Sequence, residues 1–212
     1  MIKDAPSEPE NFYVAVGRYM MMWQHVESIL CTFFVRIIRG DPTTIRRVFY
    51  STNIWESKKR MLHAALASPT LKMDENSEKF LKGFAAKVGS YQSVRNSIAH
   101  DIVVEMPAGH AHAGDVVLVH GKFDRYIADK EELASTTTLR EIQNAHVNAS
   151  ALMMVGLLFL NSKDADMYAY HRRLLHFLKE IPAEAKIGTV PKKIHNDLME
   201  LFDKKKPAIT MD

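Results

Sequence analysis

The six residues from Arg95 to His100 combine an obligate cation, an amide and a titratable imidazole in one short stretch of predicted helix. A guanidinium cannot lose its proton, so an arginine in an apolar stripe requires an anionic partner or a polar cleft. Asn96 and His100 are four residues apart and therefore share one face of the helix. The apolar stripe that contains Arg95, with alternating spacings of three and four, is Leu81, Phe84, Val88, Tyr91 and Ile98.

These residue types fit the cleavage of RNA, which carries its own nucleophile in the 2′-hydroxyl group. Cleavage needs a base, an acid and positive charge near the phosphate. His100 can transfer protons near neutral pH, and Arg95 can hold phosphate oxygens. Asn96 either orients the histidine or donates to a phosphate oxygen, and neither a metal nor another cofactor is required. On a straight helix Arg95 and His100 point about 140° apart, so they converge only if the helix loosens or two chains share a cleft.

The sequence motif Arg95-Asn96-x-x-Ala99-His100 resembles the signature of the HEPN superfamily. A tryptophan followed four residues later by a glutamate, Trp23 and Glu27, adds to the resemblance, which covers about residues 10–180. The resemblance implies a small helical domain that is often dimeric and in many members is a metal-independent endoribonuclease. It also implies that the arginine and the histidine line a cleft between two protomers.

Glu27 lies at the edge of the apolar stripe of the first predicted helix, beside Trp23, Leu30 and Cys31. It is either a boundary residue that reaches solvent or a partner for Arg95. Two opposite charges on the apolar faces of two helices satisfy each other, so we expect a Glu27–Arg95 ion pair at the catalytic site.

The chain of 212 residues has a net charge of only +3, but its charges are unevenly distributed. The segment from Arg36 to Arg60 holds seven basic and two acidic residues, so it is either a solvated helical face or a surface that attracts phosphates. Trp55 is either a core anchor, which we favour, or a platform for stacking a base. The predicted RNA-binding residues are Arg46, Arg47, Lys58, Lys59 and Arg60.

The periodicity predicts an all-α fold, a bundle of about five main helices with an inserted β-hairpin at about 101–126. We expect long helices over 8–39 and 74–100, a helical region over 42–67 that breaks near 51–53, and two helices after residues 138 and 164. Residues 1–182 form the predicted HEPN-like domain, and 183–212 form a linker, a short helix and a basic tail. The almost wholly apolar segment 151–160 suggests a subunit interface.

Several features bound the class of protein. His110, His112 and His120 in the hairpin raise a metal hypothesis, but no acidic or cysteine ligand has suitable spacing, and we predict no metal site. A single cysteine excludes an intrachain disulfide framework. The absence of an N-terminal signal segment and of a long apolar run predicts a cytoplasmic protein without a membrane partner.

The resulting prediction is a metal-independent endoribonuclease that cleaves single-stranded RNA at a dimer-interface cleft. Arg95, Asn96, His100 and Glu27 form its predicted site, and RNA and a second copy of the chain are its predicted partners. Three alternatives stay open: an inactive HEPN-like dimer that serves as an interaction module, an RNA-binding module without catalysis, and a toxin held by a protein antitoxin.

Overall fold

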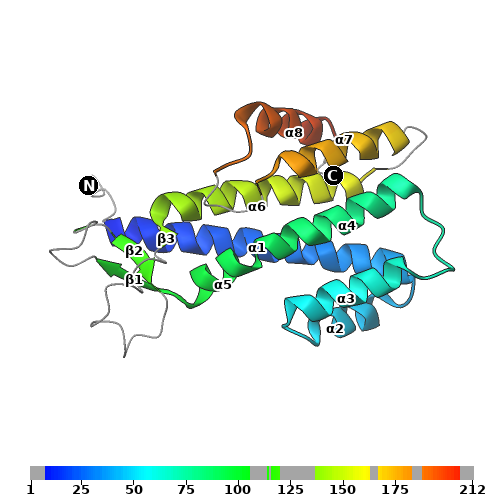
Figure 1. The fold of residues 1–212 in the computed structure, drawn as a ribbon, viewed down its shortest axis with the longest axis horizontal. Coiled ribbons are helices and arrows are strands. Elements are labelled where there is room, and N and C mark those ends of the chain that lie inside the picture. The colour runs from blue at the N-terminus through cyan, green and yellow to red at the C-terminus, as the bar shows by residue number, and fades with distance from the viewer. Residues whose placement is uncertain are drawn as a thin grey trace, which may run out of the picture.

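The computed structural model describes residues 8–105, 114, 116–119, 137–162, 167–182 and 188–205. These residues are mainly helical and include one small antiparallel sheet (Figure 1). The elements are α1 (Glu8–Ile38), α2 (Pro42–Tyr50), α3 (Trp55–Leu66), α4 (Glu75–Ser90), α5 (Gln92–His100), β1 (Ile102–Glu105), β2 (Val116–Val119), β3 (Thr137–Thr138), α6 (Leu139–Leu160), α7 (Met167–Glu180) and α8 (Lys192–Lys205). The predicted mainly helical class is therefore confirmed.

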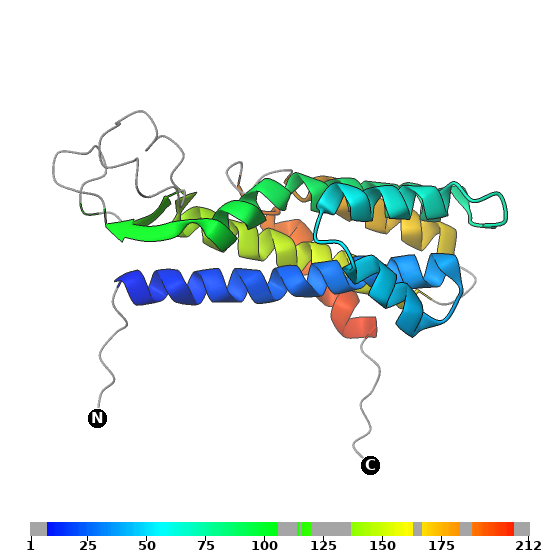
Figure 2. The same ribbon diagram turned by 90° about the horizontal axis from the view of Figure 1, so that it is seen from below.

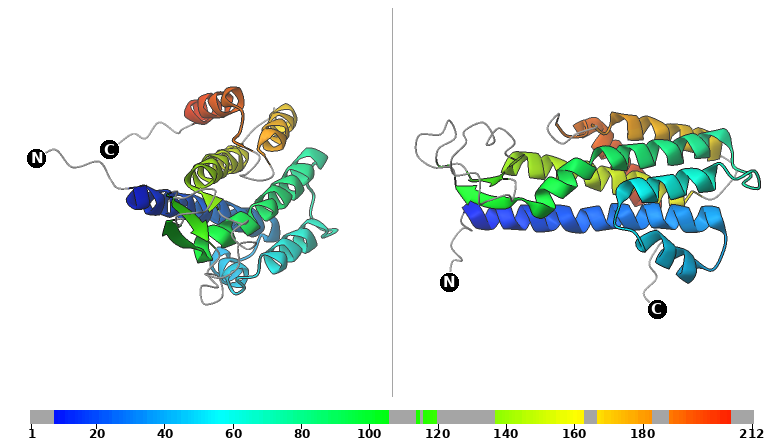
Figure 3. Two further views of the ribbon diagram at one scale, coloured as in Figure 1. Left: turned by 60° about the vertical axis from the view of Figure 1, so that its left-hand side comes forward. Right: turned by 60° about the horizontal axis from the view of Figure 1, so that its bottom comes forward.

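Helices α1 and α6 lie along each other at the centre of the fold (Figure 2). The predicted stripe of α1, including Tyr19, Trp23 and Phe33, is buried. Gly156 of α6 allows a close approach, because a Cβ atom there would lie 2.7 Å from Ile29 Cγ2. Helices α7 and α8 lie on the α6 side of α1, and α2 and α3 lie on the opposite side (Figure 3).

The apolar segment 151–160 is explained by packing within one chain. Ala151, Leu152 and Val155 are fully buried, and Phe159 stacks on Phe80 with ring centroids 4.2 Å apart. The apolar face is therefore covered by the protein's own α1 and α4, so its composition gives no support to a subunit interface at this segment.

Local sequence signals set several helix boundaries. Thr138 and Glu141 form the predicted capping box at the start of α6, and the Asp74 side chain caps the start of α4. The predicted break after α2 lies at residues 51–54. Helix α1 ends at Ile38, and the next residue, Arg39, has the left-handed φ of 55°, a conformation that residues other than glycine seldom adopt.

The single helix predicted over 74–100 is divided at Tyr91 into α4 and α5. The Tyr91 ring is fully buried, and its hydroxyl donates to the Pro182 carbonyl oxygen at 2.6 Å. The Tyr91 N–H bonds to Val88 O, three residues back, which tightens the last turn of α4. We attribute the break to this anchor, which separates the direction of α5 from that of α4.

The sheet follows α5 directly. Strands β1 and β2 pair antiparallel from Ile102↔Val119 to Glu105↔Val116, as the hairpin prediction required. A third strand, β3, pairs with β2 and was not predicted, because a strand of two residues is too short to show an alternating pattern. The loop residues His110, His112 and His120 lie outside the described residues.

The chain after α7 packs back onto α6. The Asn148 side chain donates to Gly188 O and accepts from the Val190 N–H, both at 2.9 Å, and Leu198 of α8 is fully buried. In the described part of the chain, no helix has the length and apolar character needed to cross a membrane.

Candidate functional site

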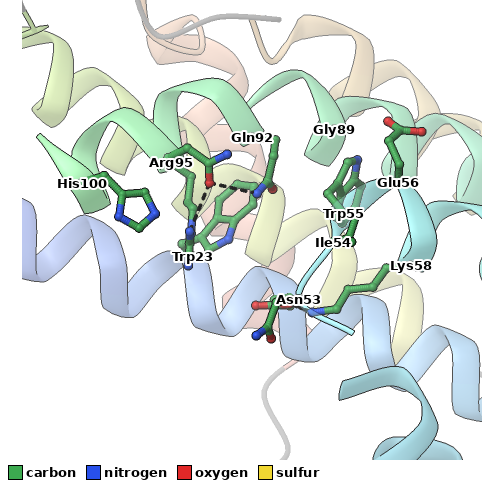
Figure 4. Close-up of a pocket in the computed structure, with 12 residues that line it drawn as sticks. Trp23, Asn53, Ile54, Trp55, Glu56, Lys58, Gly89, Gln92, Arg95 and His100 are labelled. Carbon is green, nitrogen blue, oxygen red and sulfur yellow. Dashed lines mark hydrogen bonds and ion pairs between the residues drawn. The ribbon is translucent and has the colours of Figure 1, made fainter. Parts of the chain in front are cut away.

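One cavity of about 810 Å³ gathers the four residues predicted for the catalytic site, Glu27, Arg95, Asn96 and His100 (Figure 4). It lies where α1, the start of α3 and the α4–α5 junction meet. The other residues that line it are Trp23, Asn53, Ile54, Trp55, Glu56, Lys58, Gly89 and Gln92. Its size is in the range of protein cavities that bind small organic ligands.

Three residues of α5 form a small hydrogen-bonded unit on the wall of this cavity. Arg95 is half-buried, and its Nη1 donates to Asn96 Oδ1 at 3.1 Å. Gln92 Nε2 donates to the same oxygen, also at 3.1 Å. Asn96 therefore holds Arg95 rather than His100, so the predicted orienting contact between Asn96 and the histidine is absent from this structure.

His100 is the last residue of α5 and its side chain is exposed. Within the described residues it has no hydrogen bond and no ion pair. Figure 4 shows Arg95 and His100 on the same side of α5, and both line the cavity of a single chain although they are five positions apart. The imidazole is therefore accessible to a ligand in the cavity.

The predicted ion pair between Glu27 and Arg95 was wrong. Glu27 Oε1 instead accepts from Lys58 Nζ, which also lies 5.2 Å from the centroid of the Phe49 ring. Lys58 is only 4% exposed and faces α1 from α3, so its ammonium group needs the nearby carboxylate more than the half-exposed guanidinium does. Lys58 was also predicted to bind RNA at the surface, and its burial contradicts that assignment.

The remaining predicted RNA-binding residues lie on the outside of α2 and α3. Arg46, Arg47 and Arg60 are exposed, and Lys59 is half-buried with its Nζ 3.7 Å from Glu56 Oε1. Among the described residues, Arg46 and Arg47 form no ion pair. Their charges are therefore available to phosphates, although contact with RNA stays a prediction.

Trp55 is buried to 8% exposure, which confirms its role as a core anchor. Its indole packs against α4, where a Cβ atom on Gly89 would lie 2.8 Å from Trp55 Nε1. Such a contact is too short for any side chain, so this wall of the cavity requires glycine at position 89. Trp55 Nε1 has no hydrogen-bond partner among the described residues.

Three tyrosines and one cysteine near the cavity keep their protons. Burial raises the pKa of the Tyr19 and Tyr91 hydroxyls, so both remain protonated at neutral pH. Burial raises the pKa of Tyr50 to about 12 and also raises the pKa of the Cys31 thiol. A buried thiol that holds its proton is a poor nucleophile, which argues against Cys31 as a catalytic residue.

A second histidine, His171, lies outside this cavity and links three helices. It was not selected from the sequence as a residue of interest. Its Nδ1 lies 2.9 Å from Ser77 Oγ, and its Nε2 lies 2.9 Å from Ser162 Oγ. The Ser77 hydroxyl also donates to Asp74, the N-cap of α4. Hydropathy provided one signal, because His171 falls between Met167 and Leu174 on the apolar stripe of α7.

Burial lowers the pKa of His171, and the nearby Asp74 carboxylate only partly offsets this effect. Burial alone would raise the pKa of Asp74, but hydrogen bonds from Ser77 outweigh it and lower that pKa. The ring of His171 also packs on Phe159 with centroids 4.5 Å apart. The cluster is therefore a closed link between α4, α7 and the end of α6.

No group of three or more histidine, cysteine, aspartate or glutamate side chains in the described ranges could hold a metal ion. The hairpin histidines, which raised the metal hypothesis, are not among those residues.

The chain matches no known family model, no curated protein and no solved structure. The resemblance to the HEPN superfamily therefore stays a hypothesis.

Proposed function

We propose that the protein is a metal-independent endoribonuclease of the HEPN type that cleaves single-stranded RNA. The observation that carries the proposal is the shared cavity of Arg95 and His100, where an accessible imidazole and a half-buried guanidinium line the same space. An RNA phosphate between these two groups would meet the proton-transfer group and the positive charge that its cleavage requires.

In the proposed reaction, the 2′-oxygen loses its proton and attacks the adjacent phosphorus atom while the bond from phosphorus to the 5′-oxygen breaks. The leaving 5′-oxygen takes up a proton, and the products are a 2′,3′-cyclic phosphate and a 5′-hydroxyl. His100 takes the proton from the 2′-hydroxyl and can return it to the leaving 5′-oxygen. Arg95 binds the phosphate oxygens as negative charge builds on them. Asn96 holds Arg95 in place through its Oδ1 atom.

Glu27 has a different role in this proposal from the one expected from the sequence. Its ion pair with the buried Lys58 joins α1 to α3 at the edge of the cavity. We therefore assign Glu27 and Lys58 to the shape of the site and not to proton transfer.

A homodimer would supply a second imidazole for the acid step. Helix α1 exposes Tyr13, Val14 and Met21, and Met21 is 65% exposed. Trp23 and Glu27 line the cavity from a different side of the same helix, so a second copy would have to pack beside the cavity itself, as the HEPN resemblance implies, to bring two cavities close together. Light scattering that finds only a 24.1 kDa monomer at micromolar concentrations would argue against this arrangement.

The proposal is tested by incubating purified protein with single-stranded RNA in the presence of EDTA. We expect cleavage that leaves 2′,3′-cyclic phosphate ends, no cleavage of DNA of the same sequence, and loss of cleavage in His100→Ala. A folded wild-type protein that cuts no RNA would refute the proposal. Cleavage that persists in His100→Ala would place the chemistry elsewhere.

A non-catalytic RNA-binding protein is the second candidate function. It is favoured by the absence of any described hydrogen bond that orients the His100 ring. In that case RNA would bind through Arg46, Arg47 and the cavity without being cut. A binding assay with intact RNA recovered afterwards would distinguish this function from the nuclease.

A further inference from the structure

We propose that Gln92 and Asn96 bind the edge of a nucleobase at the wall of the cavity. The inference rests on the proposed function, because it takes single-stranded RNA as the ligand that enters the cavity. It adds a base-binding subsite to a site that was built from phosphate and proton chemistry alone. Gln92 was not among the residues selected from the sequence.

The hydrogen bonds determine how both amides are oriented. An arginine side chain carries only donors, so the Asn96 atom that faces Arg95 Nη1 must be the carbonyl oxygen. Gln92 contacts the same oxygen, so it must present its nitrogen there (dashed lines in Figure 4). The usual ambiguity between amide oxygen and nitrogen is removed by the guanidinium.

This orientation leaves one acceptor and one donor for a ligand. Gln92 Oε1 and Asn96 Nδ2 have no hydrogen-bond partner within the described residues. Asn96 is exposed, Gln92 is half-buried, and both line the cavity, so a ligand can reach them. They lie one helical turn apart and offer an acceptor beside a donor.

The surroundings of this pair suit a planar base. Ile54, a large apolar side chain that is 65% exposed, lines the same cavity and offers an apolar face. Trp55, the next residue in the chain, lines the cavity as well. Arg95 is hydrogen-bonded to Asn96, so a base held by the two amides would belong to a nucleotide whose phosphate lies near the guanidinium.

Single-stranded RNA is commonly read through hydrogen bonds to the exposed edges of its bases. The common bases each present a donor next to an acceptor, which complements the wild-type pair. Guanine is distinctive because its N1–H and N2–H₂ groups are two neighbouring donors. An edge with two acceptors would therefore select guanine.

Asn96→Asp creates such an edge with almost no change in shape. The Oδ1 atom that accepts from Arg95 and Gln92 is kept, while the Nδ2 donor becomes an acceptor. We expect the ratio of affinities for GMP and inosine monophosphate, which lacks the N2 amino group, to rise about five-fold or more. The added negative charge lowers affinity for both nucleotides, so the ratio is the informative quantity.

Binding is measured by ligand-observed NMR with GMP, inosine monophosphate, AMP and ribose 5-phosphate as probes. Wild-type protein should bind AMP more tightly than ribose 5-phosphate, and Gln92→Met should lose most of that difference. Ser93→Ala, an exposed position of α5 that does not line the cavity, serves as the matched control and should behave as wild type. Thermal unfolding confirms that each variant is folded, and short oligoribonucleotides with one abasic position test whether the preference holds in RNA.

The subsite is refuted if wild-type protein binds ribose 5-phosphate as tightly as AMP. It is equally refuted if Asn96→Asp folds and leaves the ratio for GMP and inosine monophosphate unchanged. Cleavage of RNA without any base preference would reject the subsite and leave the nuclease standing. Base-dependent binding without cleavage would support the subsite and reject the nuclease.

Discussion

Two histidines of this protein lie in opposite environments. His171 is 2% exposed, and both of its ring nitrogens have serine hydroxyls at 2.9 Å. His100 is exposed at the end of α5 and has no hydrogen bond in the described part of the chain. Both ring nitrogens of His171 therefore contact other side chains of the fold, whereas the His100 ring is accessible to a ligand.

Under the proposed function, the same type of side chain serves stability in one place and chemistry in another. A buried histidine with both nitrogens bonded has nothing left for a substrate. An accessible histidine beside a guanidinium contributes little to the fold and can transfer protons. The roles of the two residues can therefore be separated by experiment, with opposite effects on activity and on stability.

The largest expected effect is a loss of RNA cleavage in the His100→Ala variant. Loss of general acid–base catalysis should reduce the rate about 10² to 10⁴-fold, with almost no change in the midpoint of thermal unfolding. Single-turnover cleavage assays measure the rate, and His25→Ala, an exposed residue of α1 outside the cavity, is the control. A fall in thermal stability that parallels the lost activity would show that His100 is structural after all.

His171→Ala should have the opposite signature. The substitution leaves a cavity beside Phe159 and removes one partner each from Ser77 and Ser162, so we expect a loss of about 2–4 kcal/mol in the free energy of unfolding. Urea denaturation measures the loss, and His100→Ala should stay within about 0.5 kcal/mol of wild type. Equal stability of the two variants would abolish the distinction drawn between the two histidines.

The Glu27–Lys58 pair provides a third test, because it joins the open site to the buried core. Glu27→Gln or Lys58→Met alone should cost about 1–3 kcal/mol, since each leaves an unpaired charge that is partly or wholly buried. The double variant should cost less than the sum of the two single variants. Glu27→Gln and Arg95→Met should instead be nearly additive, and strong coupling between them would restore the ion pair predicted from the sequence.

The smallest expected effect is the dependence of stability on pH. The pKa of His171 is lower in the folded protein than its unfolded value of about 6.5, so the unfolded state binds more protons as the pH falls. Stability from this group is complete above that value and is lost as the pH falls below it, toward the folded pKa. The unfolding temperature should therefore decrease from pH 7.5 to pH 5.

Asp74 should not contribute to this pH effect, because its pKa is lowered from 3.8 and it stays ionised over the whole range. His171→Gln should flatten the dependence, whereas His100→Ala should preserve it. An unchanged slope in His171→Gln would assign the pH effect to other groups.

The parts of the fold that were predicted correctly are those that local sequence controls. The capping box of Thr138 and Glu141 and the break before Trp55 depend on neighbouring residues, and both are present. The division at Tyr91 depends on the Pro182 carbonyl, which is distant in sequence, and no local pattern announces it. Strand β3 was missed because it has only two residues and is defined by its pairing with the distant β2.

The candidate site was predicted as a set of residues but not as a set of contacts. Glu27, Arg95, Asn96 and His100 do line one cavity. Periodicity placed Glu27 at the edge of an apolar stripe, where it was either a boundary residue or one member of an ion pair. Choosing Lys58 over Arg95 as its partner required knowing which cation is buried. Gln92 was not selected from the sequence because a single polar residue on a helix carries no functional signal by itself. Only its hydrogen bond to Asn96 indicates a role in the site.

Gly89 has a consequence for how mutations in this protein would be interpreted. The Trp55 indole occupies the space that a side chain at position 89 would need, with only 2.8 Å left for a Cβ atom. Even alanine there must displace the indole and deform the wall of the cavity. A genetic screen for loss of function should therefore recover substitutions at this uncharged position, which takes part in no chemistry, as readily as at Arg95 or His100.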